Sequence, residues 1–259
     1  MPSFFARRLK WLTKKLAESE IRSKSDYLKV GCVCFLFYLT ASLVLQFVVL
    51  PILMPHLYAG NGLMVGGDWI FFHSLASDFR ESVEKGILSI SDVPFRLGEQ
   101  FPASLLAVHY LVFGVEHASL VLPIQCLVMT IGTLSFAHIV MNLVSPRAAF
   151  FCVIACLFMP SSLLIYGQVH KDVWSVTGFA LILNGMLIFC HGSYPVERLR
   201  WAVVAALGFL FVWAPRPYLA SIFGFLSFLV LSLGFTAYLI RYKRAERSLV
   251  LSCFLLSII

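Results

Sequence analysis

Long runs of apolar residues, separated by short polar or charged breaks, dominate the sequence. They cover residues 28–54, 118–144, 148–166, 173–191, 201–214, 218–240 and 248–259. A helix needs about 20 apolar residues to cross the hydrocarbon core of a bilayer. The pattern therefore predicts an all-α, polytopic transmembrane helical bundle of about seven spans. Because the last run has only 12 residues, we expect this membrane module, residues 28–259, to continue beyond Ile259 or to be completed by another chain.

Residues 55–117 form the longest interval between predicted spans. After Asp68, apolar residues fall on one face of a helix and charged residues on the other, which indicates an amphipathic helix on the membrane surface. The run 101–114 has 14 residues, too few for an ordinary span. We therefore expect a first external loop that contains juxtamembrane helices.

The distribution of Lys and Arg favours one topology. If 101–114 does not span, 15 of these residues lie inside and five outside, whereas a spanning 101–114 gives ten on each side. Cytoplasmic segments are enriched in Lys and Arg, so the first arrangement is preferred. Residues 1–27 are then a basic cytoplasmic segment, either an interfacial amphipathic helix or a disordered anchor.

Composition excludes an ordinary soluble domain. The 259 residues are 60% hydrophobic and 13% charged, and the mean hydropathy is +0.89, whereas soluble domains are roughly half apolar and about a quarter charged. The net charge of +7 comes from short basic groups beside apolar runs, so we expect no nucleic-acid partner. The seven cysteines lie in apolar runs without a C-x-x-C pair, and the histidines are too scattered for a metal motif.

Asp68 is the first candidate functional residue. It lies in "GGDWIFFHSLASDF", residues 66–79, where an acid follows two glycines. A carboxylate here can cap the predicted helix. The glycines also allow a substrate to approach the backbone closely, which favours a functional role.

Three further charges lie at predicted external junctions. Lys171 and Asp172 stand between two apolar runs in "VHKDVW", and Arg216 lies between two prolines in "WAPRPYLA". Helix capping and snorkelling toward lipid headgroups are the structural interpretations. Charged groups that line an outward-facing cavity are the functional one. We expect these three residues to converge with Asp68 on one external polar site.

These motifs resemble the GT-C superfamily of membrane glycosyltransferases, which includes protein O-mannosyltransferases and aminoarabinose transferases. In that superfamily the first external loop carries an acid followed by aromatic and small residues, here Asp68, Phe71, Phe72, Ala76 and Gly86. The segment "FMPSSLLIYGQVHKDVWSVTGFALIL" is similar to the second external acidic site, and Asp172 matches its acid.

The resemblance implies that a sugar passes from a polyprenyl-phosphate carrier to a glycan, lipid or protein acceptor on the external or periplasmic face. Asp68 would be the general base. Lys171 and Arg216 would bind the donor phosphate, and Asp172 would hold the acceptor or a divalent metal, Mg or Mn.

Two other functions fit the same residues. A non-catalytic subunit or flippase-like protein could use Lys171 and Arg216 to bind a lipid phosphate. A polysaccharide polymerase is the second alternative, although it would rely more on external arginines. Asp68 discriminates, because a phosphate-binding site does not need a nearby carboxylate, whereas a transferase needs a base. Membrane lipids and a partner subunit complete the expected partners.

Overall fold

The computed structural model describes residues 24–89, 100–191 and 195–225. Within these ranges the chain is helical, apart from one short two-stranded hairpin. The predicted all-α class of a membrane protein is therefore confirmed.

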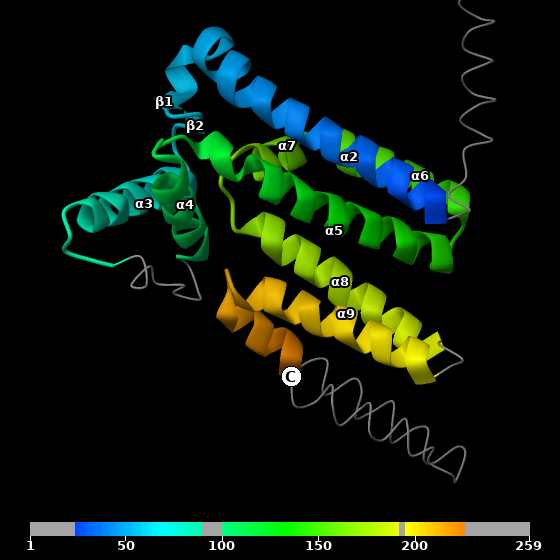
Figure 1. Ribbon diagram of the computed structural model, residues 1–259. Coiled ribbons are helices and arrows are strands. Elements are labelled where there is room, and N and C mark those ends of the chain that lie inside the picture. Colours follow the sequence, from blue (N-terminus) through cyan, green and yellow to red (C-terminus); the bar gives the residue numbers. More distant parts are fainter. Residues whose placement is uncertain (1–23, 90–99, 192–194, 226–259) are drawn as a thin grey trace, which may run out of the picture.

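The long helices lie side by side (Figure 1), and successive ones run in opposite directions. They are α2 (Lys24–Val44), α5 (Leu122–Leu143), α6 (Pro146–Phe158), α8 (Asp172–His191) and α9 (Pro195–Trp213). Helix α5 packs against α2, α6 and α8, and α8 packs against α9. This alternation brings the segments that follow α2, precede α8 and follow α9 to the same end of the bundle.

Two helical stretches are long and apolar enough to cross a membrane, namely Asp26–Leu53 and Ala118–Leu143. They match the first two predicted spans. The predicted run 148–166 is instead broken into α6 and α7 (Pro160–Gly167), which are bent by 63°. Pro160 explains the break, because proline lacks the N–H that a continuous helix needs. If this bent pair counts as one span, the described residues contain three.

The prediction of about seven spans is not supported by these residues. The runs 173–191 and 201–214 correspond to α8 and α9, whose clearly apolar parts, Asp172–Ile188 and Leu199–Trp213, are shorter than a typical span. Residues 217–225 are helical. The rest of the run 218–240, the run 248–259 and the basic residues 1–23 lie outside the described residues.

Glycines allow α8 and α9 to approach closely. A Cβ at Gly178 would lie 2.6 Å from the carbonyl oxygen of Gly208, and one at Gly185 would lie 2.6 Å from that of Trp201. Such close approach is typical of membrane helices, which gain stability from packing because lipid removes the usual hydrophobic drive.

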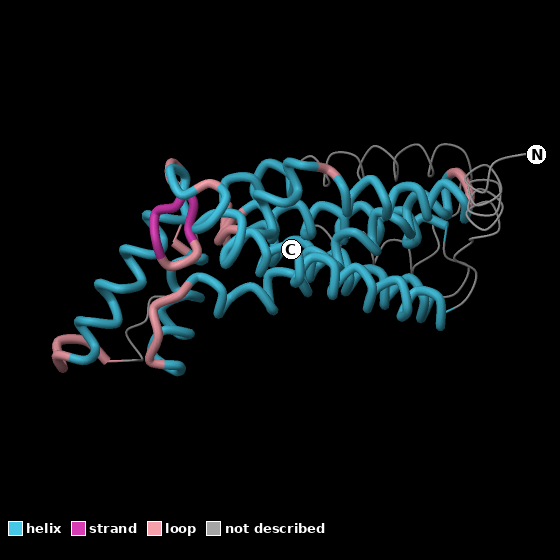
Figure 2. Tube along the Cα trace, turned by 90° about the horizontal axis from the view of Figure 1, so that it is seen from above, coloured by secondary structure: helices cyan, strands magenta, loops and turns pink. Residues whose placement is uncertain are grey.

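The segment between α2 and α5 forms a small module at one end of the bundle (Figure 2). Helix α2 continues as a π-helix, η1 (Leu45–Leu53), and a 3-10 turn, η2 (Pro55–Leu57), leads into the hairpin β1 (Tyr58–Gly60) and β2 (Leu63–Met64). Next come α3 (Asp68–Glu84), α4 (Phe101–Phe113) and the 3-10 turn η4 (Ala118–Val121), which leads into α5.

Helix α3 is amphipathic, as predicted. It buries Trp69, Phe72 and Ala76 in one core with Leu106 and Tyr110 of α4. Its opposite face carries the ion pair between Lys85 and Glu81, both of which are exposed. With 13 residues, α4 is about 20 Å long, shorter than the ~30 Å hydrocarbon core.

Candidate functional site

Two ion pairs join three segments at the end of the bundle. Lys171 Nζ lies 3.4 Å from Asp68 Oδ2, and Arg216 Nη2 contacts Asp172 Oδ1. Since Lys171 and Asp172 are consecutive, the four side chains form one group, which we call the charge cluster. The structure thus brings together all four residues that the sequence analysis selected, although they come from α3, the α7–α8 junction and the turn after α9.

Asp68 is the first residue of α3 but does not cap it. Gly67 is the N-cap residue, and no side chain caps the helix, so the prediction of Asp68 as the N-cap is wrong. Trp69 explains the local geometry: its Nε1 donates to the carbonyl of Met64, and its ring lies against Gly67, where a Cβ would be 2.1 Å from the ring. The carboxylate is left 61% exposed and turned to Lys171.

Arg216 is mounted in a proline-flanked turn, as the sequence predicts. Its backbone N–H donates to the carbonyl of Val212, 3.0 Å away at the end of α9. The guanidinium contacts Asp172 and lies 3.5 Å from the hydroxyl of Tyr218, while its Nε is buried without a hydrogen-bond partner. The side chain is 24% exposed, so it is partly desolvated yet open on one side.

His170 is a member of the site that the sequence analysis grouped with scattered external histidines. Its Nδ1 accepts the backbone N–H of Asp172 at 3.1 Å and lies 3.4 Å from the Asp172 carboxylate. The centroids of its imidazole and of the Trp69 ring lie 6.0 Å apart. Burial lowers the pKa of His170, and the nearby Asp172 and Asp68 only partly oppose this effect. Its position directly before Lys171 was the available sequence signal.

Three buried glutamines fix the α7–α8 junction, and sequence reasoning missed them. Gln125 donates to the carbonyls of Ile165, at 3.0 Å, and of Gln168, and Gln46 donates to that of Gly167 at 2.9 Å. Gln168 ties the junction to the hairpin, since it donates to the Gly62 carbonyl and accepts the Met64 N–H. For Gln46 and Gln125 the signal was a lone amide inside an apolar run, because polar groups at membrane depth need partners.

Two more histidines, in the module between α2 and α5, have structural partners. His73 Nδ1 lies 2.7 Å from the hydroxyl of Tyr110, which links α3 to α4. His117 lies 2.8 Å from Ser119 Oγ and stacks on Phe47 with ring centroids 4.9 Å apart. Burial lowers the pKa of both imidazoles, so they act as neutral links within the fold.

The side chains that the structure describes show no group that would hold a metal ion by itself. Among residues 24–89, 100–191 and 195–225, no group of three His, Cys, Asp or Glu side chains is arranged to hold a metal ion. Asp68 and Asp172 each face a cation instead. Because Mg²⁺ and Mn²⁺ are bound through several oxygen ligands, we assign no chemical step to the expected divalent metal.

The charge cluster combines two kinds of chemistry. Lys171 and Arg216 retain N–H donors beyond those that face the carboxylates, so they can bind an anionic oxygen. Asp68 offers an exposed carboxylate that can accept a proton from a hydroxyl or amine. The cluster can therefore bind an anionic leaving group and accept the proton of a nucleophile at one place.

Comparison of the chain with protein-family models, characterised proteins and solved structures finds no significant match. The functional assignment therefore depends on the residues of the cluster and on their position in the bundle. The resemblance to GT-C enzymes contributes an expectation of chemistry, which the cluster geometry makes testable.

Proposed function

We propose that the chain is a membrane glycosyltransferase of the GT-C type, which moves a sugar from a polyprenyl-phosphate-linked donor to an acceptor on the outer membrane face. One observation carries the proposal: an exposed carboxylate, Asp68, lies beside two partly buried cations, Lys171 and Arg216, at one end of a helical membrane bundle. Structural capping alone does not explain this arrangement, because Asp68 caps nothing.

The proposed topology has about seven spans, a cytoplasmic N-terminus and the charge cluster outside. The alternating directions of the long helices support it, since they bring every cluster residue to one end. The excess of Lys and Arg on the opposite side supports the same orientation. Helix α4 then lies with α3 at the outer surface and does not cross the membrane.

The donor phosphate is bound by Lys171 and Arg216. A guanidinium can hold two phosphate oxygens through parallel hydrogen bonds, and its contact with Asp172 fixes its orientation. Lys171 adds a compact positive charge. These cations stabilise the negative charge that develops on the phosphate when the sugar leaves.

Asp68 acts on the acceptor. Its carboxylate takes the proton of the acceptor hydroxyl or amine while the acceptor atom forms a bond to the anomeric carbon. The bond between this carbon and the phosphate oxygen breaks, and the polyprenyl phosphate departs with the electron pair. Asp172 is the second acidic group and contacts Arg216. It orients either the acceptor or the two cations that bind the donor phosphate.

A non-catalytic lipid-phosphate-binding subunit is the alternative of a different class. Lys171 and Arg216 would serve it equally well, and a flippase-like protein or a polysaccharide polymerase could also use them. The exposed carboxylate of Asp68 favours the transferase interpretation. In a protein that only binds phosphate, a carboxylate beside the site would repel the phosphate and weaken its binding.

The test is Asp68→Asn in the full chain, reconstituted in liposomes with polyprenyl-phosphate-linked sugars and candidate acceptors. We expect transfer to fall by about 10²- to 10⁴-fold, as is typical when a general base is lost. The free energy of unfolding should change by less than about 1 kcal/mol, because the Asp68 carboxylate is 61% exposed and water screens its contact with Lys171.

Asp78→Asn is the matched control, since Asp78 is an exposed acid on the same helix outside the cluster. It should retain wild-type transfer. If Asp68→Asn also retains transfer, the base is not Asp68. If the wild-type chain binds polyprenyl phosphate but transfers no sugar, the non-catalytic alternative holds.

A further inference from the structure

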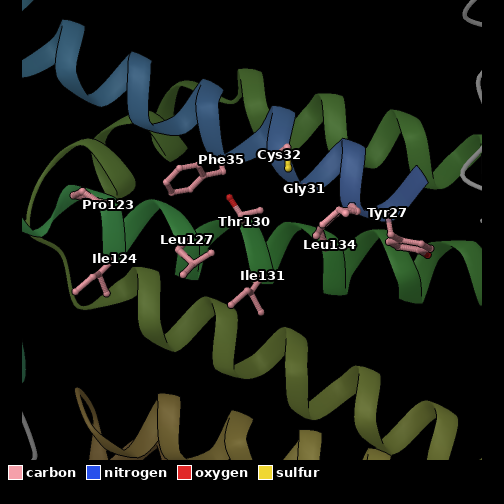
Figure 3. A pocket seen from close by; sticks show the side chains of 11 residues that line it. Tyr27, Gly31, Cys32, Phe35, Pro123, Ile124, Leu127, Thr130, Ile131 and Leu134 are labelled. Atoms are coloured by element: carbon pink, nitrogen blue, oxygen red, sulfur yellow. The ribbon is translucent and has the colours of Figure 1, made fainter. Parts of the chain in front are cut away.

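An apolar groove runs along the seam between α2 and α5 (Figure 3), and none of the four charge cluster residues lines it. It encloses about 520 Å³. Gly31 helps to form it, since a Cβ there would already lie 3.1 Å from Leu134 Cδ1. The groove is lined by Tyr27, Gly31 and Phe35 of α2 and by Pro123, Leu127 and Leu134 of α5, among others.

The groove lies at hydrocarbon depth and offers no unmet hydrogen bond. Its two walls belong to Asp26–Leu53 and Ala118–Leu143, the stretches that are long and apolar enough to span a membrane. The two hydroxyl groups on the walls have partners within the protein: Tyr27 OH donates to Met141 Sδ at 3.3 Å, and Thr130 Oγ1 donates to the Cys126 carbonyl at 2.8 Å. Its occupant must therefore be a hydrocarbon rather than water or a polar chain.

The dimensions of the groove select the kind of hydrocarbon. From Pro123 to Leu134 the α5 wall is about 16 Å long. A helix of that length and about 10 Å in diameter occupies about 1,300 Å³, well above the groove volume, so a span of another protein could lie over the groove but could not enter it. About 16 Å is also half of the ~30 Å hydrocarbon core, which is the depth of one leaflet. A polyprenyl chain longer than one leaflet would extend beyond it.

We propose that this groove is a binding site for one acyl chain of a bilayer phospholipid, held between α2 and α5. The chain covers the exposed apolar side chains of the groove, such as Leu28 and Leu127, which are 72% and 52% exposed. It thereby contributes to the α2–α5 contact as a structural lipid. This site is independent of the charge cluster and of sugar transfer.

The test compares Leu127→Trp with Leu36→Trp in the purified full chain. Both leucines are exposed on long helices, at 52% and 59%, but only Leu127 lines the groove. Native mass spectrometry in mild detergent, with phosphatidylglycerol as the added lipid, should find one retained phospholipid in wild type and in Leu36→Trp. We expect it to be lost in Leu127→Trp, because the indole fills the groove. Ile131→Trp provides a second groove variant should Leu127→Trp fail to fold.

Photo-cross-linking with a phospholipid that carries a photoactivatable group in its acyl chain shows where the lipid binds. We expect cross-links to the groove walls, and we expect added polyprenyl phosphate not to displace them. The proposal is overturned if Leu36→Trp loses the lipid as Leu127→Trp does. It is also overturned if neither Leu127→Trp nor Ile131→Trp loses it. Displacement by polyprenyl phosphate would assign the groove to the donor tail instead, and a change from dimer to monomer in Leu127→Trp would assign it to a second copy of the chain.

Discussion

The carboxylates of the two ion pairs in the charge cluster differ in their exposure to water. Asp68 is 61% exposed, so its contact with Lys171 is screened and contributes on the order of 0–1 kcal/mol to stability. Asp172 and Arg216 are 32% and 24% exposed, so water screens their attraction less. We infer that the Arg216–Asp172 pair fixes the site, while Asp68 can exchange Lys171 for an acceptor at little cost.

His170 provides a test at the same scale. Its neutral Nδ1 accepts the first backbone N–H of α8, a bond worth about 0.5–1.5 kcal/mol. Since its pKa in the folded state is lowered, mainly by burial, this stabilisation is complete above the unfolded pKa of about 6.5 and is lost as the pH falls below it. We predict that His170→Leu destabilises the protein by about 1 kcal/mol at pH 7.5.

His170→Asn is the informative comparison, because an amide oxygen can accept the same N–H and does not titrate. It should keep near wild-type stability at pH 7.5 and lose less stability than wild type between pH 7 and 5. Thermal unfolding in detergent across this pH range measures both effects. Equal acid sensitivity of wild type and His170→Asn would show that other groups, such as His73, dominate the pH dependence.

At the scale of elements, the end of α7 depends on side-chain amides that replace the missing helical hydrogen bonds. Gln125 serves the carbonyls of Ile165 and Gln168. Its replacement by Leu would leave buried carbonyls unsatisfied, and we predict a loss of about 1–3 kcal/mol in the free energy of unfolding.

Gln46→Leu serves as the comparison. Gln46 makes one bond, to Gly167, but its Oε1 is buried without a partner. The substitution removes this unsatisfied atom together with the bond, so it should cost less than Gln125→Leu. Denaturant unfolding of the two variants gives the difference directly. A larger cost for Gln46→Leu would mean that its amide oxygen has a partner, such as a buried water.

The sequence pattern predicted the elements that a regular pattern or a long apolar run marks. It missed the elements whose structure depends on single residues. The apolar face of α3 recurs with helical periodicity, and the first two spans are long continuous apolar runs, so both could be predicted. The run 148–166 is apolar throughout, but α7 begins anew at Pro160, so the run does not form one straight helix. The hairpin depends on positive φ angles at Gly60, Asn61 and Gly62, which the short sequence between apolar runs did not make evident.

For the whole molecule, the proposed topology can be measured by cysteine labelling. In a background without the seven native cysteines, Glu116→Cys lies between α4 and η4, and Val144→Cys lies at the turn between α5 and α6. We predict that an impermeant maleimide labels Glu116→Cys in intact cells, whereas Val144→Cys is labelled only after permeabilisation. The reverse pattern would place the charge cluster on the cytoplasmic face.

The convergence of the charge cluster could be predicted because topology alone brings alternate helix ends together. Counting Lys and Arg placed Asp68, Lys171, Asp172 and Arg216 on one side, and the structure joins them in pairs. The pairing itself could not be predicted, since it depends on the glutamine contacts that orient the α7–α8 junction. The contacts of Gln46 and Gln168 link residues more than 100 positions apart, as in Gln46 to Gly167.

The pairing of the cluster has a consequence for the choice of donor. Two carboxylates and two cations sum to zero formal charge, and His170 is neutral in its lowered-pKa state. A phosphodiester-linked sugar brings one negative charge, which the two cations can share without leaving a large imbalance. A diphosphate-linked sugar brings at least two, and the second would be repelled by Asp68 and Asp172 at close range. For the sugar transfer that we propose, we therefore expect a monophosphate carrier, because a diphosphate carrier would have to arrive with its own counterion.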